Sequence, residues 1–150
     1  MYTPHTVTLY NGIRSASSLS TEYNVTILRN VFLDISKGAN VIKSGLESAD
    51  AATLFIPFAV EAVNAATGEA QQYVLPKEYA QAADRSGLWT IQPGGAAGSS
   101  MCFFAKGEVV ELNADFQTVN GNHDDVFRVS SVDVRDFGSS AMQHWEVGGR

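Results

Sequence analysis

The feature of this chain that most constrains its fold is a long run of alternating apolar residues. Between Val25 and Ile35, positions 25, 27, 31, 33 and 35 are all apolar, and Arg29 interrupts the pattern. Alternation with a period of two over this length is typical of a strand that turns one face to a hydrophobic core. The run therefore predicts one long β-strand, and the rest of the chain has to supply a sheet that pairs with it.

Further strand patterns follow along the chain. They cover Thr6–Tyr10, Leu54–Ile56, Tyr73–Leu75, Leu88–Ile91, Met101–Ala105, Glu108–Leu112, Phe127–Val134 and Gln143–Val147. Inside the Phe127–Val134 run the apolar residues change parity at Ser130-Ser131, which predicts a β-bulge or bend. Eight or more short strands separated by turns predict a mainly β fold, a small antiparallel β-barrel or sandwich that forms a single domain over residues 1–150.

Helical patterns are sparse. Pro76 to Asp84 begins with proline, has Glu78 in its first turn and then several alanines, so it predicts one short helix. The segment Ala59–Ala66 fits a helix or a strand, and the turn residues after it favour a hairpin with Ala70–Val74. Long polar loops are expected at 11–22, 37–50, 94–100 and 113–125. Loops of this length are usually functional or ordered by a partner, and the glycine-rich 94–100 is expected to be flexible.

The composition excludes some classes of protein. The formal net charge is −6 and charged residues make up 17% of the chain, with the ten basic residues scattered. Binding to phosphates needs clustered Lys and Arg, so a nucleic-acid clamp is excluded. Cys102 is the only cysteine, so no internal disulfide or thiolate metal site is expected, and its apolar neighbours predict a buried thiol. No signal peptide or membrane span is expected.

The chain lacks the motifs that usually mark catalysis. His5, His123 and His144 lie outside any recognised catalytic frame, and no Gly-x-Ser-x-Gly elbow or phosphate-binding loop occurs. Asp133, Asp136 and Glu146 could supply a carboxylate pair, but dispersed carboxylates on strands usually face solvent. The sequence therefore predicts a protein that is not an enzyme and that has no cofactor or metal.

Two further groups of residues leave alternatives open. The stretch Asn120–Asp125 has oxygen ligands for a cation, but it lacks the spacing of a calcium loop. Its Asn-Gly pair is the strongest signal for a hairpin turn, which is the interpretation we favour. Trp89 and Trp145 fit a core or an interface more readily than a platform on which sugars stack.

Six segments follow one another along the chain in a distinctive order, namely 26–32, 44–57, 87–91, 104–108, 132–139 and 143–149. Together they resemble small structural proteins encoded by tailed bacteriophages and prophages near the head–tail joining genes. This resemblance implies a stopper-like neck protein that is a part of the virion, is assembled in the bacterial cytoplasm and has no catalytic activity. It implies a homo-oligomeric ring of six or twelve copies between the portal or adaptor and the tail proteins, through which DNA passes without sequence-specific contacts.

The resemblance also suggests contact residues. In the predicted loop Asn113–Asp125, the candidates for lining a channel or gripping a neighbour are Asn120, Asn122, His123, Asp124 and Asp125. Trp89 and Trp145 are the candidate interface aromatics. The acidic net charge suits a channel, because a negative lumen does not retain passing DNA. The alternatives are a tail-terminator or minor capsid component, and a ligand- or carbohydrate-binding β module.

Overall fold

The computed structural model describes residues 2–14, 21–42, 45–48, 50–93 and 101–150. The main strands are β1 (His5–Arg14), β2 (Thr21–Ser36), β5 (Ala51–Pro57), β9 (Met101–Lys106), β10 (Val126–Arg135) and β11 (His144–Gly149). The smaller elements are β3 (Ala39–Ile42), β4 (Gly45–Ser48), β6 (Glu61–Asn64), β7 (Gln72–Tyr73), β8 (Leu88–Trp89), α1 (Pro76–Gln81) and α2 (Phe116–Asn122).

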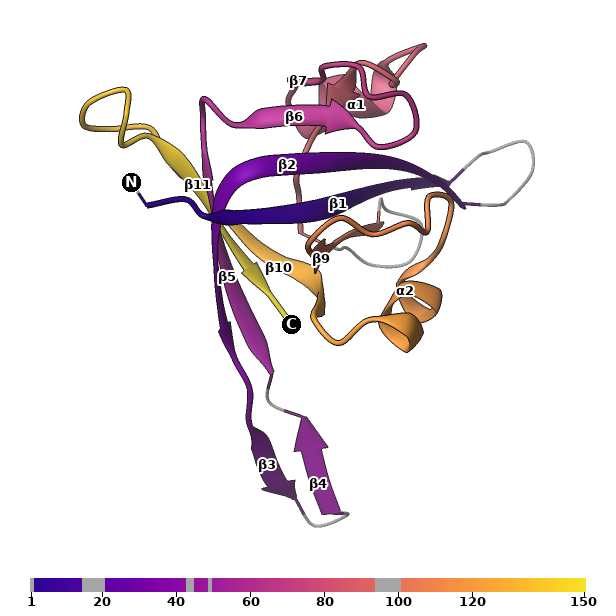
Figure 1. The fold of residues 1–150 in the computed structure, drawn as a ribbon, viewed down its shortest axis with the longest axis vertical. Coiled ribbons are helices and arrows are strands. Elements are labelled where there is room, and N and C mark those ends of the chain that lie inside the picture. The colour runs from indigo at the N-terminus through magenta and orange to yellow at the C-terminus, as the bar shows by residue number, and fades with distance from the viewer. Residues whose placement is uncertain (1, 15–20, 43–44, 49, 94–100) are drawn as a thin grey trace.

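Among the described residues, six antiparallel strands close into a barrel in the order β1-β9-β10-β11-β5-β2 (Figure 1). The barrel closes because β2 pairs with β5 at one end of its length and with β1 at the other. A strand of 16 residues is long enough to take part in both pairings. The predicted mainly β fold is confirmed, and it is a barrel rather than an open sandwich.

A β-bulge at Asn30 lets β2 serve these two pairings. Asn30 has a φ of 65°, a conformation that asparagine tolerates better than most residues. The register with β1 shifts at this point, so that the buried side chains are Leu28 before the bulge and Val31 after it. The prediction of one uninterrupted alternation from Val25 to Ile35 is therefore wrong before the bulge. The extra residue, Asn30, places Leu28 rather than Ile27 on the face that Val31 occupies after it.

The second bulge was predicted from the sequence and is confirmed. The pairing of β10 with β11 shifts between Val129 and Ser131. Val129 is buried before the shift, and Val132 lies opposite the fully buried Val147 after it. The bulge keeps apolar side chains directed into the barrel on both sides of a polar Ser-Ser pair, since one residue is left outside the ladder.

The helix α1 confirms the predicted helix, although it ends at Gln81 rather than near Asp84. The helix α2 corrects the expectation of a loop with an Asn-Gly turn at residues 113–125, because Asn120-Gly121 lies in the last turn of that helix. Asp115 caps it by accepting a hydrogen bond of 2.9 Å from the backbone N–H of Thr118. The cap by Asp115 depends only on residues next to it in sequence. The packing of Val119 against the barrel favours a helix over a turn at Asn120-Gly121.

Two other expected segments differ in detail. The segment 108–112 belongs to no strand ladder in the described part of the chain. The expected hairpin of 59–66 with 70–74 is reduced to one bridge between Val63 and Ala70, because β6 pairs with β2 and β7 pairs in parallel with β8. The predicted glycine-rich loop 94–100 lies outside the described residues.

The expected loop at 37–50 contains a hairpin, β3 with β4, which continues the ribbon of β2 with β5. Ser36 pairs with Ala51, and Ala39 then pairs with Ser48 in the same register. At the junction, the Gly38 N–H donates to Asp50 Oδ1 at 3.1 Å. This two-stranded arm extends beyond the barrel in Figure 1.

Two apolar clusters hold the fold together. The larger fills the barrel and extends under β8, while the smaller lies between the outer face of β1 and β9 and the helix α2. Trp89 and Trp145 belong to the larger cluster, with ring centroids 5.4 Å apart and exposures of 1% and 6%. Neither indole is therefore available on the surface of this fold as an interface aromatic or a sugar platform, because burial against the core competes for the same large apolar rings.

Candidate functional site

The predicted contact residues at the end of α2 are tied to the segment that precedes the helix. His123 Nε2 lies 2.9 Å from Glu111 Oε2, and Asn122 Nδ2 donates to Glu111 Oε1 at 3.3 Å. The hydrogen bond from His123 is the main cause that lowers the pKa of the Glu111 carboxyl. Asn120 is exposed, whereas Asn122 and His123 make the contacts with Glu111. These three residues therefore form the end of an anchored helix rather than a free loop.

The two aspartates that follow lie beside the base of the arm. Asp125 Oδ1 is 3.0 Å from Lys37 Nζ, just before β3. This contact is the main cause that raises the pKa of the Lys37 ammonium, and the charges of Asp124 and Asp50 contribute further. The structure thus brings the predicted acidic pair to the place where the arm leaves the barrel, and Asp124 itself is exposed.

Residues 107–113, named the strap here, cross the outside of the barrel between β9 and α2. Thr8 Oγ1 donates to the carbonyl of Gly107 at 2.7 Å and accepts from the Val109 N–H at 3.0 Å. Tyr10 donates its hydroxyl to the carbonyl of Glu111. The strap is therefore held at several points, with Val109 buried and the next side chain, Val110, 85% exposed.

A hollow of about 480 Å³ lies on the outside of the barrel across β2, β5 and β11. This aromatic hollow is lined by Tyr2, Phe32, Phe55, His144 and Glu146. The rings of Phe32 and Phe55 lie on directly paired residues, with centroids 5.8 Å apart, and His144 is 5.8 Å beyond Phe55. The hollow is therefore walled mainly by aromatic rings, with Glu146 as the carboxylate at its edge.

Sequence reasoning missed the aromatic hollow and the exposed position on the strap, although signals for both were present. The predicted alternation directs Leu33 inward and so directs its neighbour Phe32 outward. The expected strand 108–112 likewise places Val109 and Val110 on opposite faces. A large apolar residue on the solvent face of a strand marks a contact surface when several of them meet in space, which only the strand order decides.

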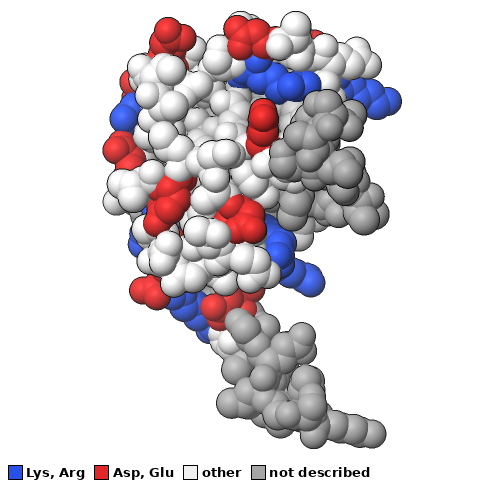
Figure 2. Space-filling view, turned by 90° about the vertical axis from the view of Figure 1, so that its right-hand side faces the viewer, with Lys and Arg blue, Asp and Glu red and all other residues white. Residues whose placement is uncertain are grey.

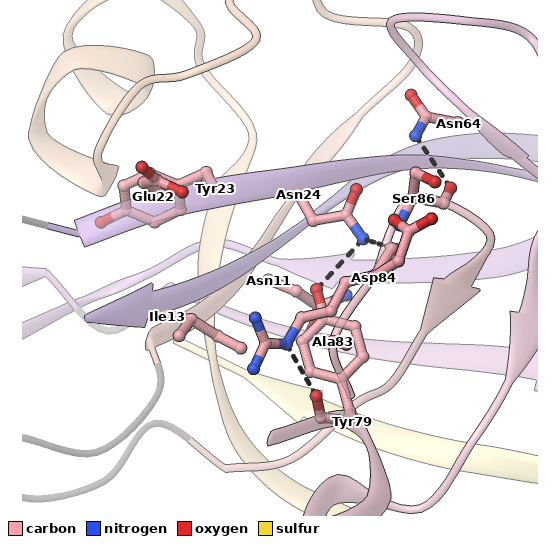
Figure 3. Close-up of a pocket in the computed structure, with 11 residues that line it drawn as sticks. Asn11, Ile13, Glu22, Tyr23, Asn24, Asn64, Tyr79, Ala83, Asp84 and Ser86 are labelled. Carbon is pink, nitrogen blue, oxygen red and sulfur yellow. Dashed lines mark hydrogen bonds between the residues drawn. The ribbon is translucent and has the colours of Figure 1, made fainter. Parts of the chain in front are cut away.

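A polar pocket of about 550 Å³ lies between the barrel and the chain that leads into and out of α1 (Figure 3). It is lined by Asn11, Ile13, Glu22, Tyr23, Asn24, Asn64, Tyr79, Ala83, Asp84, Arg85 and Ser86. Asn24 Nδ2 donates to the carbonyls of Arg85 at 2.8 Å and Leu88 at 3.0 Å, and it lies 3.1 Å from the Tyr79 hydroxyl. These contacts fasten the α1 segment to β2.

Three polar side chains of this pocket could meet a small molecule. Asn11 is 4% exposed, and its Nδ2 has no hydrogen-bond partner among the described residues. Arg85 donates through Nε and Nη2 to the carbonyls of Tyr79 and Ala80, which caps the end of α1 and leaves further guanidinium N–H groups at the pocket. Asp84, whose pKa is lowered by hydrogen bonds from Ser86, adds a carboxylate.

No group of three or more His, Cys, Asp or Glu side chains suited to a metal ion occurs within the described ranges. Of the helices that the structure describes, none is long and apolar enough to cross a membrane. The features with the geometry of a contact site are the arm, the strap, the aromatic hollow and the polar pocket.

These features define the chain as a closed antiparallel β-barrel protein that carries a projecting arm and surfaces suited to contacts with other molecules. The chain belongs to DUF6751, a family of unknown function, whose family model matches residues 2–150. Neither the curated proteins nor the solved structures contain a significant match to it.

Proposed function

We propose that this protein is a structural component of a tailed-phage virion that forms a ring at the head–tail joint. The observation that carries the proposal is the arm, because a hairpin that keeps the register of β2 with β5 and extends beyond a closed barrel can reach a neighbouring molecule without disturbing the core. The resemblance of segments 26–32, 44–57 and 132–139 to proteins of phage head–tail joining regions gives the proposal its biological setting.

Two further properties support a role in assembly. The acidic pair Asp124-Asp125 follows the anchored end of α2, and Asp125 is paired with Lys37 at the base of the arm. The face in Figure 2 carries scattered charges of both signs separated by broad uncharged areas, which favours contacts between protein surfaces over attraction to a polyanion. Portal, adaptor or tail proteins are the partners in this proposal, and DNA passes through the ring without being recognised.

Shortening the arm tests this function. Replacing residues 39–48 with Asn-Gly keeps the register of β2 with β5 and closes the ribbon with a two-residue turn, which antiparallel strands accept readily. We expect the variant to fold with the same circular dichroism spectrum and unfolding temperature, while virions of the encoding phage that carry it lose tails or packaged DNA. Leu75→Ala, an exposed position beside α1, is the control.

Electron microscopy of the same particles decides between the outcomes. Density for the wild-type protein as a closed layer at the neck supports the proposal. Density that caps the tail tube or lies in the capsid wall would instead support a tail-terminator or minor capsid role. Normal virions from the shortened-arm variant would contradict the part assigned to the arm.

A second candidate function, a module that binds a small polar ligand, is favoured by the unpartnered Nδ2 of Asn11 in the polar pocket. A carbonyl or carboxylate oxygen would satisfy that N–H, and Arg85 lies in the same pocket. Thermal-shift screening with amino acids and sugars tests this function, with Asn11→Leu as the variant that removes the donor. A ligand that stabilises the wild type but not the variant would support it, whereas no shift with any compound would count against it.

A further inference from the structure

The polar pocket lies where the inner face of β1 and β2 continues past the apolar filling of the barrel. Val7 and Leu28 are paired on this face and belong to the larger cluster. Further along the same continuous register Asn11 is paired with Asn24, so the two asparagines occupy the face of the core residues. The pocket is therefore a mouth of the barrel, which is a place where β-barrels commonly hold small ligands.

The chain that follows α1 covers this mouth and is fixed in place. The Ser86 carbonyl accepts from Gln71 Nε2 at 2.8 Å and from Asn64 Nδ2 at 3.0 Å. Gln71 is itself hydrogen-bonded to the buried Thr26 of β2. The amide of Asn24 ties the same segment to β2 (Figure 3). A pocket whose walls are already ordered loses little conformational freedom when a ligand binds.

Hydrogen-bond donors lie at the inner end of the pocket. Asn11 is 4% exposed, its Oδ1 is 3.7 Å from Cys102 Sγ, and its Nδ2 has no partner among the described residues. Arg85 lines the same pocket, and its guanidinium carbon is 5.6 Å from the centroid of the Tyr79 ring. An unpartnered amide N–H and a guanidinium group are the donors that suit a carboxylate.

Carboxylates line the outer part of the same pocket. Asp84 and Glu22 are both exposed, and Asp84 Oδ1 accepts from the Ser86 N–H at 3.0 Å. A simple anion that reached Arg85 would meet two negative charges here, which oppose its binding. An uncharged sugar would leave the charged groups without charged partners. A ligand that carries one negative and one positive group satisfies both ends of the pocket.

We propose that this mouth of the barrel binds a free α-amino acid, with its carboxylate toward Asn11 and Arg85 and its ammonium group at Asp84. Ile13 and Ala83 line the same pocket and offer apolar contacts to the side chain of the amino acid. The volume of about 550 Å³ is in the range of sites for small molecules. The inference deepens the second candidate function and rests on it, since it names the class of the small polar ligand.

Titrations of the whole chain, followed by NMR of its amide groups, test the two ends of the ligand separately. The probes are leucine, 4-methylpentanoate, which lacks the ammonium group of leucine, and 3-methylbutylamine, which lacks its carboxylate. Alanine, lysine and glucose are titrated beside them. Leucine should bind about tenfold more tightly than either truncated analogue, because each analogue loses a hydrogen bond between charged groups. Binding should also shift the side-chain amide signal of Asn11.

Two variants assign the ends to residues. Asp84→Asn removes the charge at the outer end and keeps an oxygen for the Ser86 N–H, so it should weaken leucine about tenfold without weakening 4-methylpentanoate. Asn11→Leu should weaken both. Glu78→Gln, at an exposed position of α1, is the control and should change neither. Circular dichroism checks each fold, and Asp84→Asn at its exposed position keeps the test decisive if Asn11→Leu unfolds.

The outcomes separate this inference from the function on which it rests. Equal affinities for leucine and its analogues, or an effect of Asp84→Asn no larger than that of Glu78→Gln, would overturn the inference. Binding of glucose without any of the three amino acids would overturn it and leave the second candidate function in place. If no compound binds, both are contradicted.

Discussion

His123 and Glu111 join the end of α2 to residues 107–113 through a hydrogen-bonding contact of 2.9 Å between Nε2 and Oε2. The contact belongs to tertiary structure, because the two residues lie at opposite ends of the segment that contains the helix. It also makes the stability of this region depend on the protonation of one carboxyl group.

We expect acid to weaken the anchoring of α2 through Glu111. The pKa of this carboxyl is lowered from 4.5 by the His123 hydrogen bond. A depressed folded-state pKa means that the carboxylate stabilises the fold above about pH 4.5, and that this contribution is lost as the pH falls through the lower folded value. Glu111→Gln should therefore lower the urea midpoint at pH 7 by more than it does at pH 3. An equal loss at both pH values would contradict this assignment, and exposed Glu69→Gln is the control.

Asn24 should be a strong determinant of stability, although it is neither apolar nor fully buried. Its amide donates to carbonyls of the chain after α1, including those of Arg85 and Leu88. Replacement by Leu leaves these carbonyls without their donor and should cost about 1–3 kcal/mol in the free energy of unfolding. Urea unfolding measures the loss, with exposed Gln81→Ala as the control, and a change no larger than the control's would show that water replaces the amide.

Gly149 should not tolerate a side chain, because it lies against two phenylalanines of the barrel interior. A Cβ there would lie 2.8 Å from Phe104 Cζ and 2.9 Å from Phe127 Cβ. Gly149→Ala should destabilise the fold by about 1–3 kcal/mol through overpacking. Gly87→Ala, where an added Cβ meets nothing within 4 Å, is the matched control and should be close to neutral. Equal unfolding midpoints for the two variants would rule out this packing.

Cys102 should be inert to thiol reagents in the folded protein. Burial raises the pKa of its thiol to about 12, and its Sγ lies 3.7 Å from Asn11 Oδ1. Since the thiolate is the reactive form, a disulfide reagent at pH 8 should react only as fast as the barrel opens. Reaction in denaturant should be complete within the mixing time. Rapid stoichiometric labelling of the native protein would contradict the burial of this residue.

The sequence alone supports the main strands of the barrel, the bulge at Ser130-Ser131 and the helix that begins at Pro76, because each leaves a pattern within a few neighbouring residues. The same local logic fails at Asn120-Gly121, where a strong turn signal lies inside α2. Burial of Val119 under the barrel outweighs the turn preference there. The bulge at Asn30 was missed for a related reason, since only the competing pairings of β2 with β1 and β5 require it.

For the candidate sites, local sequence determined which residues are apolar or charged, and tertiary structure decided which of them meet. Trp89 and Trp145 have the composition of an interface but lie in contact inside the barrel. Phe32 and Phe55 are 23 residues apart in sequence, and they form the hollow because β2 pairs with β5 in one particular register. Strand order and register depend on long-range pairing and loop closure, which no short stretch of sequence encodes by itself.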